Sequence, residues 1–194
     1  ANWGAIKNEI AYAFHRPTTT PTPQANIVTP KPIQEPAHIQ ISRIGVDTPI
    51  KWNVSAEQTI EALNQGVAHL AGTAKLGEIG NLFITGHSSD YAWKKNPYAA
   101  VFSLLPKLQT GDIITIRENG RTYTYRVAET KIVNPDQVEV ANPTTTPVLT
   151  LLTCYPIGST RQRYIVHATL VSSPEKPVAV KSTDPFTAPV IRFR

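Results

Sequence analysis

The chain has 194 residues, 41% of them hydrophobic and 17% charged, with a formal net charge of +5. This length and composition fit one globular domain of medium size with a real core. A single cysteine excludes a disulfide scaffold, and scattered basic residues argue against nucleic acid as a partner. The positive charge favours anionic surroundings such as a cell wall or a membrane surface.

The N-terminal part does not resemble the rest of the chain. Because the sequence lacks methionine even at position 1, we expect it to be a processed or truncated piece. No apolar run approaches the roughly 20 residues that span a bilayer, so any signal or membrane anchor is expected in the missing part. Residues 1–15 carry the apolar stripe of a short helix, and residues 16–37 form a Pro/Thr-rich linker.

The first ordered elements are two short strands and a helix. Residues 37–52 predict two strands around a Gly-Val-Asp turn. The helix that follows has Ser55 as a candidate N-cap and Gln58 as the partner that completes a capping box. Gly66 is expected to end this helix.

The second half of the chain predicts mainly strands. The expected elements are a buried strand ending at His87, a short helix at 96–112 broken by Pro106, a hairpin around Asn119-Gly120, and the strands "PVLTLLTCY" and "RYIVHATLV". Many short strands with short helices between them indicate a β-barrel or β-sandwich, which we place at residues 38–172. A Pro-rich tail follows at 173–194.

Three residues at predicted strand ends have side chains suited to nucleophilic chemistry. A thiol becomes a useful nucleophile beside a base or a cation, and acyl transfer also needs an oxyanion donor. If the last two strands pair antiparallel, Cys154 and Arg163 can face each other with Cβ atoms about 5 Å apart. His87 would supply the base. The alternatives are an inert buried thiol, a surface histidine and a solvated arginine.

The motifs around these residues resemble those of a known family. "LTLLTC" and "RYIVHA" look like the Thr-Leu-x-Thr-Cys and Arg-x-hydrophobic-Val-x-Ala signature of sortases, the cysteine transpeptidases of bacterial cell surfaces. The stretch from Gly66 to His87 is also similar to the sortase segment that ends in the catalytic histidine. The resemblance covers about residues 38–172. It implies a mainly β fold, a closed barrel of about eight strands with short helices inserted and an N-terminal helix.

Transferred residue by residue, the resemblance implies a catalytic role for each of the three. Cys154 would be the nucleophile, His87 the general acid/base and Arg163 the oxyanion stabiliser. Arg161 is the rival for the arginine role. Thr153 would contact substrate through its hydroxyl or its backbone.

The loop at 134–146 is expected to shape the groove that binds the substrate. Val138 and Val140 are its apolar candidates for contacting the leucine of a sorting signal, or they pack the loop onto the barrel. Asp90 could orient the histidine, although a polar turn residue is the preferred interpretation.

No metal or other cofactor is predicted. Some sortases use calcium, but here the acidic residues before the cysteine strand are only Asp136 and Glu139. The remaining histidines are expected to be solvated or structural: His15, His38, His69 and His167.

The function implied is cleavage of a Leu-Pro-x-Thr-Gly-like signal after its threonine, through a thioester on Cys154. The acyl group would pass to an amine of peptidoglycan or of a pilin, at the extracellular face of the bacterial cell membrane. Papain-like hydrolases place the cysteine before the histidine, and L,D-transpeptidases place the two within a few residues, so neither order fits. The non-enzyme alternative is a surface β domain with an inert cysteine, or a degenerate sortase that only binds signals.

The subclass is open between several kinds of sortase. The N-terminal linker lacks the Asp-Pro-aromatic lid motif of pilus-building sortases, which favours a housekeeping or class D/E-like anchoring enzyme. "DPF" at 184–186 raises the hypothesis of a C-terminal lid.

Overall fold

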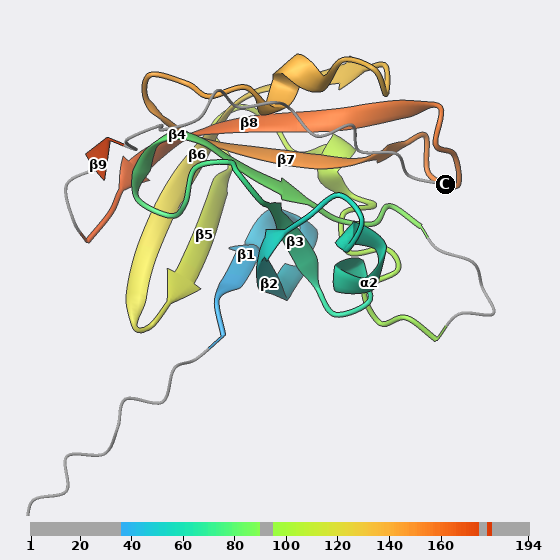
Figure 1. Cartoon of the computed structure of the whole chain (residues 1–194), viewed down its shortest axis with the longest axis horizontal. Coiled ribbons are helices and arrows are strands. Elements are labelled where there is room, and N and C mark those ends of the chain that lie inside the picture. Colours follow the sequence, from blue (N-terminus) through green and yellow to red (C-terminus); the bar gives the residue numbers. More distant parts are fainter. Residues whose placement is uncertain (1–35, 90–94, 175–177, 180–194) are drawn as a thin grey trace, which may run out of the picture. The chain divides into compact units, whose positions relative to one another are not determined.

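The computed structural model describes residues 36–89, 95–174 and 178–179 (Figure 1). The contacts divide the chain into units at 1–32 and 33–194, and all of these residues belong to the second. The helix expected at 1–15, nearly all of the linker and most of the tail, including its "DPF" motif, lie outside the described residues. Within the described ranges no helix is long and apolar enough to cross a membrane.

The described part of the chain is built around one nine-stranded sheet that closes into a barrel (Figure 1). The strands are β1 (His38–Ile41), β2 (Val46–Val54), β3 (Val67–Leu70), β4 (Glu78–Thr85), β5 (Ile113–Glu118), β6 (Arg121–Val133), β7 (Pro147–Tyr155), β8 (Gln162–Ser172) and β9 (Val178–Ala179).

Closure of the barrel comes from β3, which pairs with β2 on one side and with β4 on the other. The order is β3-β2-β1-β5-β6-β8-β7-β4-β9, and the extra β3–β4 pairing leaves a closed barrel of eight strands with β9 outside it. The β2–β3, β4–β7 and β4–β9 pairs are parallel and the others are antiparallel. The predicted mainly β fold with a closed barrel is therefore confirmed.

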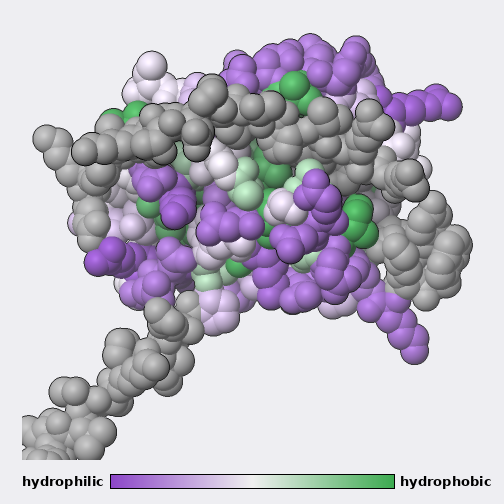
Figure 2. All heavy atoms as spheres, viewed as in Figure 1, coloured by the Kyte–Doolittle hydropathy of each residue, from purple (hydrophilic) through white to green (hydrophobic). Residues whose placement is uncertain are grey.

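The two faces of the sheet carry two separate apolar clusters, because successive strand side chains point to opposite faces. The interior of the barrel is filled by side chains such as Leu151 and Val166. Leu152 and Ile165 belong instead to a cluster on the outer face. The segment that joins β6 to β7 covers this cluster and contains the 3-10 helix η3 (Val138–Ala141). Hydrophilic residues dominate the visible surface of the described part (Figure 2).

The hairpin between β5 and β6 forms where it was predicted. Asn119 and Gly120 both have positive φ, 50° and 75°. These values suit the two-residue turn whose twist matches that of paired strands.

The predicted capping box before the helix α2 (Thr59–Leu63) is wrong. The N-cap residue is Gln58, and no side chain caps the helix. The hydroxyl of Ser55 donates instead to the Glu57 carboxylate at 2.7 Å, and the Ser55 carbonyl accepts from the hydroxyl of Thr59 at 2.9 Å. Local side-chain bonds have replaced the cap.

The prediction of a short helix at 96–112 is also wrong, because this segment consists of turns and a 3-10 helix. Residues 97–104 form turns with main-chain bonds three residues apart, such as Val101 to Tyr98. They lead into the 3-10 helix η2 (Leu105–Lys107), where Pro106 lies in the first turn rather than breaking a helix. Proline fits there because the first turn has no partner for its N–H. A third 3-10 helix, η1 (Ser42–Ile44), connects β1 to β2.

The main chain at Gly66 lies so close to Pro49 of β2 that only glycine fits there, and this close approach can be tested by substitution. Its φ is +145°, and a Cβ placed on it would overlap the carbonyl oxygen of Pro49. We expect Gly66→Ala to lower the free energy of unfolding by about 2–4 kcal/mol in urea titrations. Gly45→Ala is the control, because Gly45 has φ +66° with open space around it, and should cost about 1–2 kcal/mol. Equal losses would contradict the close approach.

Candidate active site

Cys154 and Arg163 are directly opposite each other in the antiparallel β7–β8 pair, which confirms the predicted strand pairing. Cys154 is half-buried, whereas the Arg163 side chain is buried. Nη1 of Arg163 donates to the carbonyls of Thr160 and Gln162 at 2.8 and 2.9 Å. The turn between the two strands therefore holds the guanidinium beside the thiol.

Two opposing effects act on the thiol of Cys154. Burial raises its pKa and the charge of Arg163 lowers it, and the net direction is upward. Burial is the larger of the two effects. The thiol is consequently protonated at neutral pH, and a base must take its proton before it can attack.

The parallel pairing of β4 and β7 brings His87 to the level of Cys154. Thr85 is paired with Leu152, so His87 and Cys154 each lie two residues beyond the same register position. The strand ends at Thr85 rather than at His87. His87 is half-buried, and its carbonyl accepts the N–H of Phe102 at 2.8 Å.

Hydrogen bonds tie the two segments together beyond the strand ends. The N–H of Gly86 donates to the carbonyl of Leu152 at 3.1 Å. The hydroxyl of Thr153 donates to the carbonyl of Gly86 at 2.8 Å. Because Thr153 is 1% exposed, its predicted contact with substrate would have to be made by the backbone. The hydroxyl joins the residue before Cys154 to the residue before His87.

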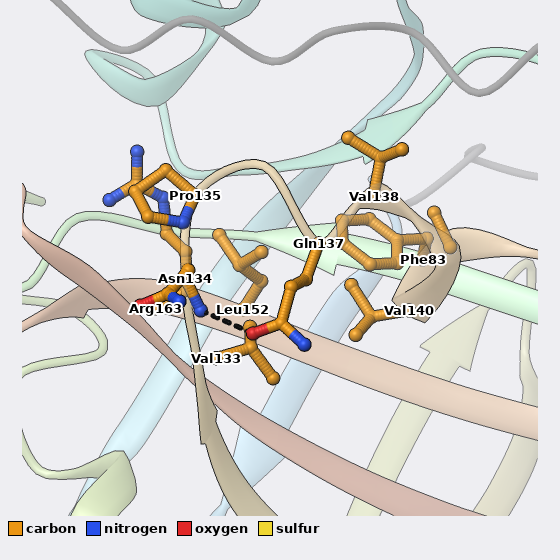
Figure 3. Close-up of a pocket in the computed structure, with 10 residues that line it drawn as sticks. Phe83, Val133, Asn134, Pro135, Gln137, Val138, Val140, Leu152 and Arg163 are labelled. Atoms are coloured by element: carbon orange, nitrogen blue, oxygen red, sulfur yellow. Dashed lines mark hydrogen bonds between the residues drawn. The ribbon is translucent and has the colours of Figure 1, made fainter.

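A small pocket opens beside Arg163, under the β6–β7 segment (Figure 3). Val138 and Val140 line it from that segment, and Phe83 and Leu152 line it from β4 and β7. Val140 also packs against the outer cluster, so both predicted alternatives, groove lining and loop packing, apply to it. The pocket is therefore apolar at one end and cationic at the other.

Four further candidates from the sequence are Arg161, His38, Asp90 and His15. Arg161 is exposed, which favours Arg163 for the arginine role. His38 is half-buried and its Nδ1 lies 3.0 Å from the Asp47 carboxylate. Asp90 and His15 lie outside the described residues.

His69 is a structural residue of β3, as predicted. It is fully buried; its Nδ1 accepts the N–H of Asn53 at 3.2 Å and its Nε2 lies 3.1 Å from the carbonyl of Ala74. Burial lowers the pKa of His69 to about 4, so the ring stays neutral.

The acidic residues before the cysteine strand lie on the surface. Asp136 and Glu139 are exposed. In the part of the chain that the structure describes, no group of three His, Cys, Asp or Glu side chains could hold a metal ion.

Two polar residues of the outer face did not figure in the sequence prediction. Asn81 and Thr150 are 3% and 0% exposed and hydrogen-bonded to each other at 2.6 Å. Asn81 also donates to the carbonyls of Val140 and Asn142 in the β6–β7 segment. The available signal was a polar residue within each apolar run, "GNLFITGH" and "PVLTLLTC", because a buried polar group needs a partner.

The opposition of Cys154 and Arg163 predicts the reactivity of the thiol. Arg163→Gln removes the cation, so the pKa of Cys154 should rise further and alkylation by iodoacetamide at pH 7 should slow by about tenfold, because the thiolate is the reacting form. Arg163→Lys should retain most of the rate, and Arg161→Gln, at an exposed position, should retain all of it. A pH dependence of alkylation that is unchanged in Arg163→Gln would contradict the geometry.

Comparisons with known proteins identify the family of this chain. The family model described as Sortase domain matches residues 39–171. Sortase A of Bacillus anthracis is 29% identical over 138 residues, which are 71% of this chain and 60% of that protein. The chain spans about three fifths of the length of the curated relatives it matches, 60% and 63%.

Solved sortase structures share the fold. The Sortase D5 transpeptidase of Clostridium perfringens is 31% identical with a TM-score of 0.58, over 70% of this chain and 78% of that one. Sortase C1 of GBS Pilus Island 1 is 32% identical with a TM-score of 0.62, over 73% and 66%. A family match that spans the barrel, and solved sortases of the same fold, show that this chain belongs to the sortase family.

Proposed function

We propose that this protein is a cysteine transpeptidase that cleaves a Leu-Pro-x-Thr-Gly-like sorting signal after its threonine and transfers the acyl group to an amine. The observation that carries the proposal is the direct opposition of Cys154 and Arg163 in β7 and β8, with His87 at the same level in the parallel neighbour β4. Nucleophile, acid/base and oxyanion donor thus converge at one end of three adjacent strands.

In the first half-reaction, His87 accepts the thiol proton as Sγ of Cys154 attacks the carbonyl carbon of the signal's threonine. The guanidinium of Arg163 stabilises the negative oxygen that develops. His87 then gives the proton to the leaving amine as the peptide bond breaks. The products are a thioester on Cys154 and the free C-terminal part of the signal.

In the second half-reaction, an incoming amine attacks the thioester and His87 accepts a proton from it. The C–S bond breaks, the Cys154 sulfur leaves as a thiolate and takes the proton from His87, and a new amide bond joins the signal to the acceptor. The same three side chains act in both halves, in accordance with microscopic reversibility.

The pocket beside Arg163 supports recognition of an apolar residue near the scissile bond. Val138 and Val140 face Phe83 across it (Figure 3), and the leucine of the signal would fill this apolar end. Burial of a leucine side chain contributes about 1.5–3 kcal/mol. Arg163, the proposed oxyanion donor, lines the other end of the same pocket.

The partners follow from this reaction. We infer surface proteins that carry the signal, and an amine acceptor in peptidoglycan or on a pilin lysine, with the enzyme anchored at the extracellular face of the bacterial membrane. The net charge of +5 supports such anionic surroundings. A housekeeping or class D/E-like anchoring role is the preferred subclass.

The direct test is incubation with a Leu-Pro-x-Thr-Gly peptide and an amine, followed by mass spectrometry. We expect the cleaved signal joined to the amine, and an acyl adduct on the protein when the amine is omitted. Cys154→Ala should form neither, because the acyl acceptor atom is gone. Peptide that binds but remains intact would favour the alternative of a degenerate sortase that only binds signals.

The pH dependence tests His87. Attack requires one proton on the pair formed by Cys154 and His87: with two protons the imidazole cannot accept the thiol proton, and with none the leaving amine cannot be protonated. The rate should therefore rise and then fall with pH. Without the imidazole the falling limb should disappear, and His87→Ala should lower kcat by about 10²–10⁴-fold. A profile that stays bell-shaped and unshifted in His87→Ala would contradict the assignment.

A further inference from the structure

A chain of polar side chains crosses the outer face of the barrel beneath the β6–β7 segment. Thr150 of β7 lies between Asn81 of β4 and His167 of β8. Its Oγ1 is 2.6 Å from Oδ1 of Asn81 and 2.9 Å from Nδ1 of His167. Thr150 is fully buried and Asn81 nearly so, so both depend on protein partners.

The donor and the acceptor of each hydrogen bond in this row of polar side chains can be assigned, starting from Asn81. The carbonyls of Val140 and Asn142 can only accept, so the side-chain NH₂ of Asn81 faces them, at 2.9 and 3.1 Å. Oδ1 of Asn81 must then accept the one hydroxyl proton of Thr150. The remaining capacity of Oγ1 is as an acceptor, so Nδ1 of His167 must carry a proton.

We propose that His167 is a positioning residue for binding of the sorting signal, an inference that rests on the function proposed above. Its Nδ1–H orients the hydroxyl of Thr150, and this hydroxyl in turn orients the side-chain amide of Asn81. The amide holds the β6–β7 segment in place by donating to two of its main-chain carbonyls. One of these carbonyls belongs to Val140, which lines the pocket beside Arg163. The polar chain therefore ends at the wall of the groove rather than at the thiol.

The outer side of His167 faces charged residues of β6. Nε2 lies 3.8 Å from a carboxylate oxygen of Glu129, and Nζ of Lys131 lies 3.9 Å from the same oxygen. Burial and the charge of Lys131 lower the pKa of His167, and Glu129 opposes them. Titration takes place at Nε2, so the Nδ1–H and the chain beyond it are kept in both charge states.

Two substitutions separate this role from simple packing. His167→Asn places an amide NH₂ at the position of Nδ1 and can still donate to Thr150. His167→Leu fills similar space without a donor, so Thr150 loses the bond that orients it. A loosened groove wall should weaken signal binding and leave the chemistry at Cys154 intact.

The first measurement uses the wild-type protein and needs no turnover. Long-range ¹H–¹⁵N spectra of histidine-labelled protein at pH 8, with the His167 signals identified by their loss in His167→Asn, report which ring nitrogen carries the proton. We expect a protonated Nδ1 and a bare Nε2 for His167. A proton on Nε2 alone would overturn the proposal, whatever the protein's activity.

The second measurement is the steady-state kinetics of signal-peptide cleavage. His167→Leu should raise KM by about tenfold with kcat within about twofold, and His167→Asn should restore most of the loss, since one buried hydrogen bond is at stake. Equal effects of the two variants, or no effect of either, would overturn the proposal. Thr169→Val is the control, because Thr169 is an exposed residue on the same strand face.

The two measurements also separate this inference from the proposed function. If the wild-type protein neither cleaves nor transfers the signal, the proposed function fails while the tautomer still decides whether the polar chain exists. Cys154 alkylation should be unchanged in His167→Leu, since the groove wall and not the thiol is altered. Slower alkylation in that variant would contradict a role confined to the groove.

Discussion

The parallel pairing of β4 with β7 is the constraint on which the rest of the site depends. It sets Thr85 opposite Leu152 and so brings His87 and Cys154 to one level, from segments far apart in the sequence. The antiparallel β7–β8 pair then places Arg163 opposite Cys154. One-residue slips in either register would turn these side chains to the wrong face of the sheet. The hydroxyl of Thr153, bonded to the Gly86 carbonyl, secures the register at the point where it matters for chemistry.

The electrostatics of the thiol follow from the same geometry. The strand end is buried enough to raise the pKa of Cys154, and the guanidinium offsets only part of this. A thiol that rests protonated is less exposed to oxidation and adventitious alkylation, since both act on the thiolate. The proposed reaction then requires a base close to the thiol, and His87 is the proposed base. Fold and chemistry are coupled through the register rather than through any single contact.

Sequence patterns predicted the structural features that depend on residues close together in the sequence. The hairpin at Asn119-Gly120 and the opposition of Cys154 and Arg163 both follow from strand alternation across a short turn. The capping box at Ser55 failed because the Glu57 carboxylate competes for its hydroxyl. The β4–β7 pairing and the bonds of Asn81 join residues about 60–70 positions apart, which no local pattern encodes. The net direction of the thiol pKa depends on burial, which also requires the folded barrel.

The most direct test of this account is the titration of the His87 imidazole, followed by NMR in Cys154→Asp and in Cys154→Ala. If the register places the two side chains together, the carboxylate in Cys154→Asp stabilises the imidazolium, so the titration should extend to higher pH in Cys154→Asp than in Cys154→Ala. Identical titration curves in the two proteins would contradict the central claim that β4 and β7 bring His87 and Cys154 into one site.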